Sequence, residues 1–135
     1  MDYKQVFWES HHYRFGLAGE GQADIIERYL NTKRGRVLNI GCGPGSDKLN
    51  NLAGHCGSLI AADISSKSIN IARADRGHHD VSYLITDTLK LALAMDTIDH
   101  ILALGLFFHI KDLDIVFGEF YRVCRTGGYL MITNS

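Results

Sequence analysis

The sequence contains little of what marks a secreted, a membrane-spanning or a nucleic-acid-binding protein. Its three cysteines are an odd number with no Cys-x-x-Cys pair, so we expect neither a disulfide framework nor a zinc knuckle. No apolar run reaches the roughly 18 residues of a membrane span, and the polar residues 1–5 lack a signal-peptide core. The formal net charge is −1 with dispersed Lys and Arg, which predicts no nucleic-acid partner. These absences indicate a cytoplasmic protein.

Proline is scarce as well, and this favours one compact domain. The 135 residues include a single proline and are 46% hydrophobic. We expect an aromatic N-terminal segment over residues 1–19 and the main domain over residues 20–135. The segment either folds over a binding site as a lid or packs Phe7 and Trp8 on the sheet's outer helices. His11 and His12 are adjacent and lack a suitably spaced third ligand, so we expect no metal site.

The central motif is Val-Leu-Asn-Ile-Gly-Cys-Gly-Pro-Gly, residues 37–45. Its first four residues read as a short buried strand, and its three glycines turn the chain sharply without side chains to obstruct a ligand. A helix is expected to begin near Ser46, which is a plausible N-cap. Loop amides and the positive helix end would then face the crevice at the carboxyl end of a sheet. The motif therefore predicts a site for a polar, partly anionic ligand.

A second apolar strand, residues 58–62, ends at Asp63, 22 residues after Gly41. This is close to the roughly 20-residue offset at which a carboxylate accepts hydrogen bonds from ribose hydroxyls. The spacing therefore predicts a nucleoside-like ligand. A nicotinamide dinucleotide uses the same parts, but its Gly-x-Gly-x-x-Gly fingerprint requires a glycine where Ser46 stands, so we disfavour it.

Strands and helices alternate along the rest of the chain. The apolar patterns predict strands at 37–40, 58–62, 81–86, 98–104 and 129–133. They predict helices at 20–31, from 46 to about 54, from Ser65 or Ser66 to about 76, and at 112–125, the last ended by Gly127 and Gly128. Strands separated by helices imply right-handed crossovers and a parallel sheet, so we expect the α/β class.

Five stretches, taken in order, resemble the landmarks of class I S-adenosylmethionine-dependent methyltransferases. They are residues 37–45, Ala-Asp-Ile-Ser at 62–65, Ile-Thr-Asp at 85–87, Asp-His-Ile-Leu at 99–102, and residues 119–130. The resemblance implies a Rossmann-like, doubly wound, mostly parallel sheet of about five strands in the order 3-2-1-4-5, with helices on both faces. It also implies S-adenosylmethionine as cofactor and S-adenosylhomocysteine as product.

The resemblance assigns four residues to the adenosine half of this cofactor. Asp63 would hold the ribose and Ile64 would pack on the adenine. Asp87 would take the adenine amino group, with Thr88 beside it. Each assignment has a structural alternative: the two acids are also suited to strand ends or helix caps, and Ile64 to the core.

Four further residues are assigned to the methionine half. Gly41, Cys42 and Gly43 would lie against it, and Leu104, at the end of the fourth strand, would line the same side. Leu104 is equally suited to the core. Cys42 reads as a small loop residue rather than a nucleophile, because nothing in the motif supplies it with a base.

The chemistry needs few catalytic groups, because the sulfonium already activates the methyl and alignment does most of the work. His109 follows the fourth strand on the side where an acceptor would approach, so it is the candidate to accept a proton from a hydroxyl or amine. A structural histidine is the favoured alternative. The resemblance and this chemistry predict methyl transfer to a small-molecule acceptor.

Three features depart from the family. Asn39 stands where an acid is common, which weakens the expected interaction with the ligand's amino group, and Thr126 stands where proline is common. The strands that usually follow the fifth are missing, so we expect an unpaired apolar edge there. The chain is then truncated, a small natural variant, or a subunit that pairs this edge in a homodimer. A non-catalytic ligand-binding or dimerising module is therefore the alternative function.

Overall fold

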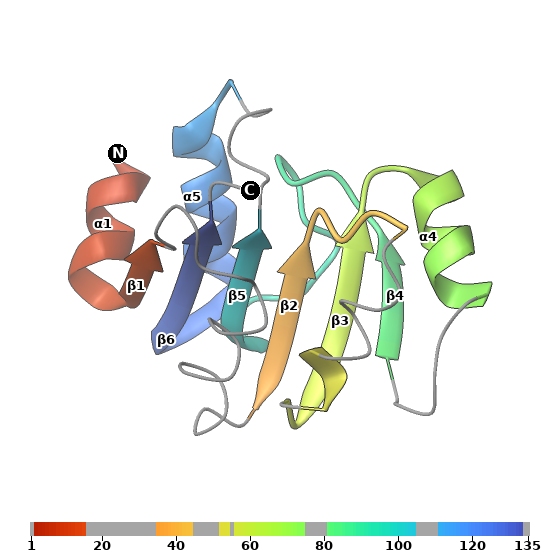
Figure 1. Cartoon of the computed structure of the whole chain (residues 1–135). Helices are drawn as coiled ribbons and strands as arrows, with labels where there is room; N and C mark the ends of the chain where they lie inside the picture. Colours follow the sequence, from red (N-terminus) through yellow and green to blue (C-terminus); the bar gives the residue numbers. More distant parts are fainter. Residues whose placement is uncertain are drawn as a thin grey trace.

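A single parallel sheet forms the centre of the computed structural model, which describes residues 2–15, 35–44, 52–54, 56–74, 81–104 and 111–133. The elements are α1 (Tyr3–Ser10), β1 (His12–Phe15), β2 (Arg36–Ile40), β3 (Ser58–Asp63), α4 (Ser66–Ala74), β4 (Val81–Ile85), β5 (Ile98–Leu104), α5 (Leu113–Val123) and β6 (Cys124–Thr133). The six strands of these segments lie in the order β1-β6-β5-β2-β3-β4, and every neighbouring pair is parallel (Figure 1).

The predicted strand order is confirmed. The five predicted strands correspond to β2, β3, β4, β5 and β6, and their order in the sheet is 3-2-1-4-5. Ser65 caps α4 as predicted, because its side-chain oxygen accepts a hydrogen bond from the Ser68 amide at 3.1 Å. The predicted helix at 20–31 lies outside the described residues, and of the one beginning near Ser46 only residues 52–54 are described.

Two hydrophobic cores lie on opposite faces of the sheet, because the central strands bury side chains alternately. Leu38, Ile101 and Leu130 belong to the core under α1 and α5. Val37 and Leu102, one position away along their strands, belong to the core on the face that includes Ala72 of α4. This period of two, with apolar residues on both faces, is typical of a parallel sheet covered on both sides. None of the helices in the described segments has the length and apolar composition needed to cross a bilayer.

The prediction of an unpaired edge at the fifth strand is wrong. β1 lies beside β6 along this edge, with His12 opposite Tyr129 and Phe15 opposite Ile132 (Figure 1). β1 of the N-terminal segment thus covers this edge, and the reason for expecting a homodimer through it disappears. Of the segment expected at 1–19, residues 16–19 lie outside the described part.

α1 is attached to α5 by buried aromatic rings. The Phe7 side chain is fully buried and meets the Phe117 ring edge-on at 5.8 Å. His11 stacks on Phe7 at 4.2 Å, and its Nε2 lies 3.2 Å from the carbonyl oxygen of Cys124. Because a carbonyl oxygen only accepts, this contact places a hydrogen on Nε2. Phe7 therefore packs on an outer helix, whereas the side chain of Trp8, expected to do the same, lies outside the described part.

The connection from α5 to β6 is shorter than expected. α5 ends at Val123, and β6 begins at Cys124, so Gly127 and Gly128 do not end the helix. They lie instead where the register of β6 against β5 shifts, between the Ile98 and His100 pairs. A Cβ on Gly128 would lie 2.6 Å from the Cys124 Sγ and closer still to a backbone oxygen of Asp99. The glycine permits this close approach of two backbones.

Asp99 connects three segments at the amino end of the sheet. Its Oδ2 accepts a hydrogen bond from the Arg36 amide at 2.7 Å, and its Oδ1 lies 2.7 Å from the Arg125 guanidinium. Burial alone would raise the pKa of Asp99, but these hydrogen bonds and the positive charge of Arg125 outweigh it, so the pKa lies below its usual value. The ionised carboxylate is therefore the form that the fold stabilises.

We expect Asp99→Asn to lower the free energy of unfolding by about 1–3 kcal/mol at pH 7, because an amide cannot accept both hydrogen bonds. A lowered folded-state pKa contributes stability above the unfolded-state pKa and loses it as the pH falls through the folded-state value. The difference between wild type and variant should therefore shrink as the pH falls below about 4. Urea unfolding across this pH range measures it, and a constant difference would contradict the assignment.

Candidate functional site

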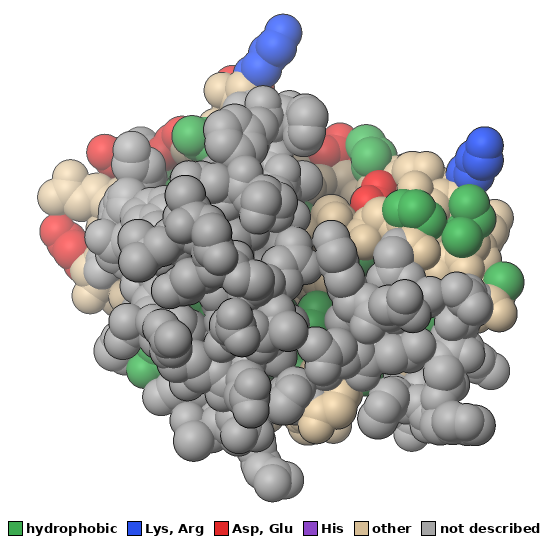
Figure 2. Space-filling view, in the orientation of Figure 1, with side chains coloured by type: hydrophobic (Ala, Val, Ile, Leu, Met, Phe, Trp, Pro, Cys, Tyr) green, Lys and Arg blue, Asp and Glu red, His purple; other side chains and the backbone are tan. Residues whose placement is uncertain are grey.

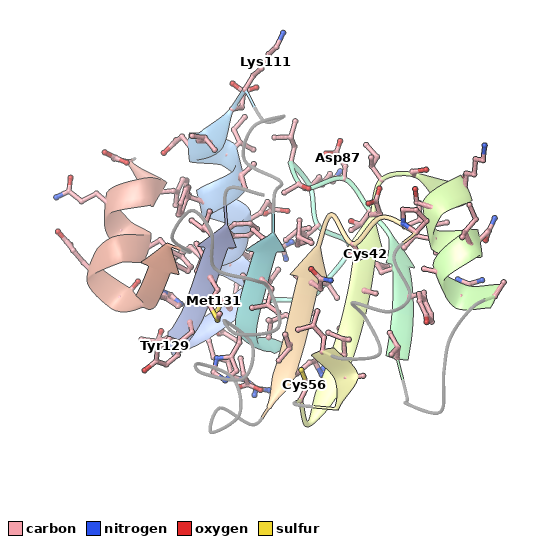
Figure 3. All side chains as sticks on the ribbon, in the orientation of Figure 1. Cys42, Cys56, Asp87, Lys111, Tyr129 and Met131 are labelled. Carbon is pink, nitrogen blue, oxygen red and sulfur yellow. The ribbon has the colours of Figure 1, made fainter. Side chains whose placement is uncertain are left out.

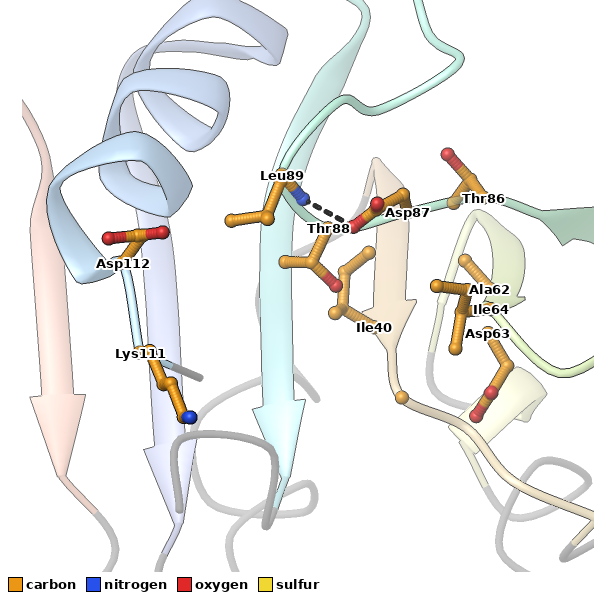
Figure 4. A pocket seen from close by; sticks show the side chains of 11 residues that line it. Ile40, Ala62, Asp63, Ile64, Thr86, Asp87, Thr88, Leu89, Lys111 and Asp112 are labelled. Carbon is orange, nitrogen blue, oxygen red and sulfur yellow. Dashed lines mark hydrogen bonds between the residues drawn. The ribbon is translucent and has the colours of Figure 1, made fainter. Parts of the chain in front are cut away.

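A cavity of about 430 Å³ opens at the carboxyl ends of β2, β3 and β4. We call it the sheet-end cavity (Figure 4). Its lining residues among the described part are Ile40, Gly41, Ala62, Asp63, Ile64, Thr86, Asp87, Thr88, Leu89, Lys111 and Asp112. Its volume is in the range of small-molecule sites, and in parallel α/β sheets ligands bind at this end of the strands.

The glycine loop and the acid after the second predicted strand meet at this cavity, as the motif spacing predicted. Gly41 and Asp63 both line it. The amides of Gly41 and Cys42 donate to the Ala62 carbonyl oxygen at 2.8 and 3.0 Å, and the Gly43 amide donates to the Asp63 Oδ2 at 2.9 Å. Gly41 and Gly43 have φ values of 74° and 60°, which favour glycine.

These bonds correct one expectation. The loop amides were expected to face the ligand, but those of residues 41–43 are already donated to β3 and to Asp63. The reason is the pairing of β2 with β3: the loop after β2 crosses the end of β3, where the Ala62 carbonyl and the Asp63 carboxylate are nearby acceptors. The loop is thereby fixed beside β3.

Asp63 has both a structural bonding pattern and spare acceptor capacity. Its Oδ1 accepts from the Ser65 amide at 2.9 Å, while its Oδ2 accepts from Gly43. Each carboxylate oxygen offers about two acceptor positions, so the bonds from the described residues occupy one position on each oxygen and leave one. The strand-end role that the sequence left open therefore exists, and it leaves room for two further donors such as hydroxyl groups.

Ile64 lines the cavity, whereas Cys42 is absent from its lining and packs against the second core. Ile64 is 68% exposed at the cavity wall, so the alternative that it belongs to the core is wrong. Cys42 is half-buried, and its Sγ donates to the Gly43 carbonyl at 3.3 Å. Burial, with the nearby charge of Asp63, raises the pKa of the Cys42 thiol to about 11. A protonated thiol is a poor nucleophile, in agreement with its reading as a loop residue.

The turn after β4 brings Asp87 and Thr88 to the same cavity. Asp87 Oδ1 accepts from the Leu89 amide at 2.9 Å (Figure 4), and the Asp87 carbonyl accepts from the Lys90 amide at 3.0 Å. The Thr86 hydroxyl oxygen accepts from the Ala92 amide at 2.9 Å. Both of the acids predicted to bind the adenosine half thus line one cavity, within a turn held by its own hydrogen bonds.

The charge at the cavity is predominantly negative. Asp63, Asp87 and Asp112 line it, and Lys111 is the one cation among its described lining residues. Acidic side chains, with Lys and Arg side chains among them, are visible along the upper rim of the molecule, the end at which Asp87 and Lys111 lie (Figures 2 and 3). The excess of carboxylates in the cavity lining favours a ligand that carries positive charge.

Lys111 and Asp112 were not predicted as site residues, although a signal existed. They are polar residues directly before α5, and a helix start after a strand is the position at which ligands bind in parallel α/β sheets. Leu104 ends β5 as predicted, but its side chain lies outside the described part, as does His109. Asn39 is buried within β2 and is absent from the cavity lining.

Comparisons with known proteins identify relatives. A sequence family described as "Methyltransferase domain" matches residues 38–132. The chain is 33% identical over 123 residues to the methyltransferase GfsG of Streptomyces halstedii, covering 87% of this chain and 44% of that protein.

Solved structures show the same fold. Phosphoethanolamine N-methyltransferase 1 of Haemonchus contortus, solved with phosphoethanolamine and S-adenosylhomocysteine, is 22% identical with a TM-score of 0.69, covering 81% of this chain and 24% of that one. An S-adenosylmethionine-dependent methyltransferase of Mesorhizobium loti is 23% identical with a TM-score of 0.69, covering 86% and 54%. The chain thus spans little more than half, or less, of each of these three proteins.

Proposed function

We propose a function from one premise: the chain belongs to the methyltransferase-domain family, as the match over residues 38–132 shows. The class I methyltransferase family expected from its motifs is thereby confirmed. The proposal is that this chain binds S-adenosylmethionine in the sheet-end cavity and transfers its methyl group to a small-molecule acceptor. The observation that carries it is the meeting of Gly41 and Asp63 at one cavity.

The described residues fit this cofactor. An adenosyl group needs acceptors for ribose hydroxyls, an apolar surface for the base and room for both. The described residues leave Asp63 two acceptor positions, Ile64 offers an exposed apolar side chain, and the cavity holds about 430 Å³. The acidic lining suits a sulfonium, which carries a positive charge.

In this proposal each residue that the resemblance assigned to the cofactor has a binding role. Asp63 accepts from the ribose hydroxyls and Ile64 packs against the adenine. Asp87 accepts from the adenine amino group, and Thr88 lies beside it. On the methionine side, the residues assigned by the resemblance are Gly41, Cys42, Gly43 and Leu104.

The bound cofactor supplies a methyl group already activated by its positive sulfur, so the protein's contribution is to hold the reacting atoms in line. The loop of residues 41–43, fixed to β3 by three hydrogen bonds, gives a rigid wall for this purpose. His109 stays the candidate proton acceptor. The free thiols Cys42, Cys56 and Cys124 support a reducing, cytoplasmic location.

Titration calorimetry with S-adenosylhomocysteine tests the binding. We expect saturable binding with a micromolar dissociation constant, and no competing signal from NAD, which shares the loop-and-acid arrangement. No heat at millimolar S-adenosylhomocysteine would contradict the proposal, and tight NAD binding would favour the dinucleotide alternative.

Transfer itself needs a second measurement, because the chain spans 44% of the length of GfsG. Incubation with methyl-labelled S-adenosylmethionine and a panel of hydroxyl and amine acceptors should yield labelled product. Binding without transfer across the panel would instead favour the non-catalytic ligand-binding module.

A further inference from the structure

Two charged residues of α5 hold the turn that follows β4. Glu119 and Arg122 lie three positions apart on the helix and form an ion pair, with Arg122 Nε at 2.8 Å from Glu119 Oε2 and Nη2 at 3.1 Å from Oε1. Such a two-point pairing fixes the plane of the guanidinium. The remaining donors of Arg122 are thereby aimed in defined directions.

The guanidinium of Arg122 donates hydrogen bonds to backbone carbonyl oxygens of the turn. Arg122 Nη1 donates to the Leu93 carbonyl oxygen at 2.7 Å, and Nη2 donates to the Leu91 carbonyl oxygen at 2.8 Å. Glu119 Oε1 accepts from the Leu91 amide at 2.7 Å. Both backbone groups of Leu91 are therefore bound by the pair, and its side chain is buried in the core.

The same turn carries cavity residues a few positions earlier. Asp87, Thr88 and Leu89 line the sheet-end cavity, whereas Glu119 and Arg122 are absent from its lining. A hydrogen bond also joins the two ends of the turn: the Thr86 hydroxyl oxygen accepts from the Ala92 amide at 2.9 Å. Fixing Leu91 and Leu93 from α5 therefore limits where Asp87 and Thr88 lie.

We infer that Glu119 and Arg122 are positioning residues that set the affinity for the adenine end of the cofactor through the backbone of residues 91–93. The inference rests on the proposed binding of the adenosyl group in the sheet-end cavity. The pair touches no ligand, and it acts by holding the turn that does. Arg122→Lys would keep the charge, but a single ammonium group could not pair with both Glu119 oxygens and also reach both carbonyl oxygens.

Calorimetry with S-adenosylhomocysteine on folded Arg122→Met should show roughly 10-fold weaker binding, since a small displacement of binding groups is costly. Arg122→Lys should fall between that variant and the wild type. Arg125→Met is the matched control: it also removes an arginine that pairs with a carboxylate, Asp99, and reaches a backbone oxygen, that of Asp96. It should lower stability and leave the affinity unchanged.

A double-mutant cycle distinguishes positioning from general loosening. If the pair acts through Asp87, Arg122→Met should weaken binding less in an Asp87→Ala background than in the wild type. Equal losses in both backgrounds would overturn the inference, as would unchanged affinity in Arg122→Met or an equal loss in the Arg125→Met control.

Hydrogen exchange separates this inference from the proposed function, since it needs no ligand. Arg122→Met should speed exchange of the Leu91 and Ala92 amides by at least about 10-fold while the amides of β3 stay protected. Unchanged exchange at residues 91 and 92 would overturn the positioning role. A wild type that binds no S-adenosylhomocysteine, with faster exchange in the variant, would contradict the proposed function alone.

Discussion

Asp63→Ala is expected to weaken S-adenosylhomocysteine binding by at least about 100-fold. The change removes the acceptors proposed for two ribose hydroxyls, and hydrogen bonds to a charged group are worth about 1.5–3 kcal/mol each. It also leaves the amides of Gly43 and Ser65 without their side-chain acceptor, so the loop beside β3 loses part of its support. Titration calorimetry on the variant measures the loss of affinity.

Asp63→Asn provides the graded comparison, because its amide oxygen can still accept while its nitrogen cannot. Its affinity should lie between those of the wild type and Asp63→Ala. Asp99→Asn is the control for a general loss of stability, since Asp99 serves the opposite end of the sheet. A folded Asp63→Ala protein that binds within threefold of the wild type would remove the ribose assignment.

Gly128→Ala is expected to lower the free energy of unfolding by more than about 3 kcal/mol, which is in the range of severe overpacking. The new Cβ would lie 2.6 Å from the Cys124 Sγ and 2.9 Å from the Arg125 carbonyl oxygen, with a backbone oxygen of Asp99 nearer still. Two of these three atoms belong to the backbone, so a movement of the Cys124 side chain alone could not relieve the overlap. Urea unfolding of the purified variant measures the cost.

The neighbouring glycine is the matched control. Gly127 has a φ of 83°, but a Cβ there meets no atom within 4 Å. Its alanine variant should therefore suffer only the backbone strain, about 1–2 kcal/mol. If Gly127→Ala proved more destabilising than Gly128→Ala, the close approach at the β5–β6 irregularity would not be what requires the glycine.

Local patterns were sufficient to predict the centre of the fold. The runs at Val37–Ile40 and Ile98–Leu104 are mostly apolar and short, as parallel strands buried on both faces are, and the predicted spans agree with β2 and β5 to within one residue. The place of Asp63 at the cavity also followed from sequence spacing. In parallel sheets this works because the carboxyl ends of all strands meet at one edge.

Features that depend on distant pairing could not be predicted in this way. β1 has only four residues, His-Tyr-Arg-Phe, with no clear alternation, and it is stabilised by a strand at the other end of the chain. The Glu119 and Arg122 pair reads in the sequence as an ordinary solvated helix face, since their backbone partners are some 30 positions away. The hydrogen bonds from the amides of residues 41–43 to β3 could not be predicted for the same reason, because their acceptors lie some 20 positions further along the chain.

The pairing of β1 with β6 also has a consequence for how the chain assembles. His11 and the Cys124 carbonyl that it contacts are 113 positions apart, so this edge raises the contact order of the fold. The entropy of closing so long a loop must be overcome before the pairing contributes anything. On the ribosome, the aromatic segment emerges well before β6 exists. We therefore expect the sheet to be completed late in folding, after the central strands have formed.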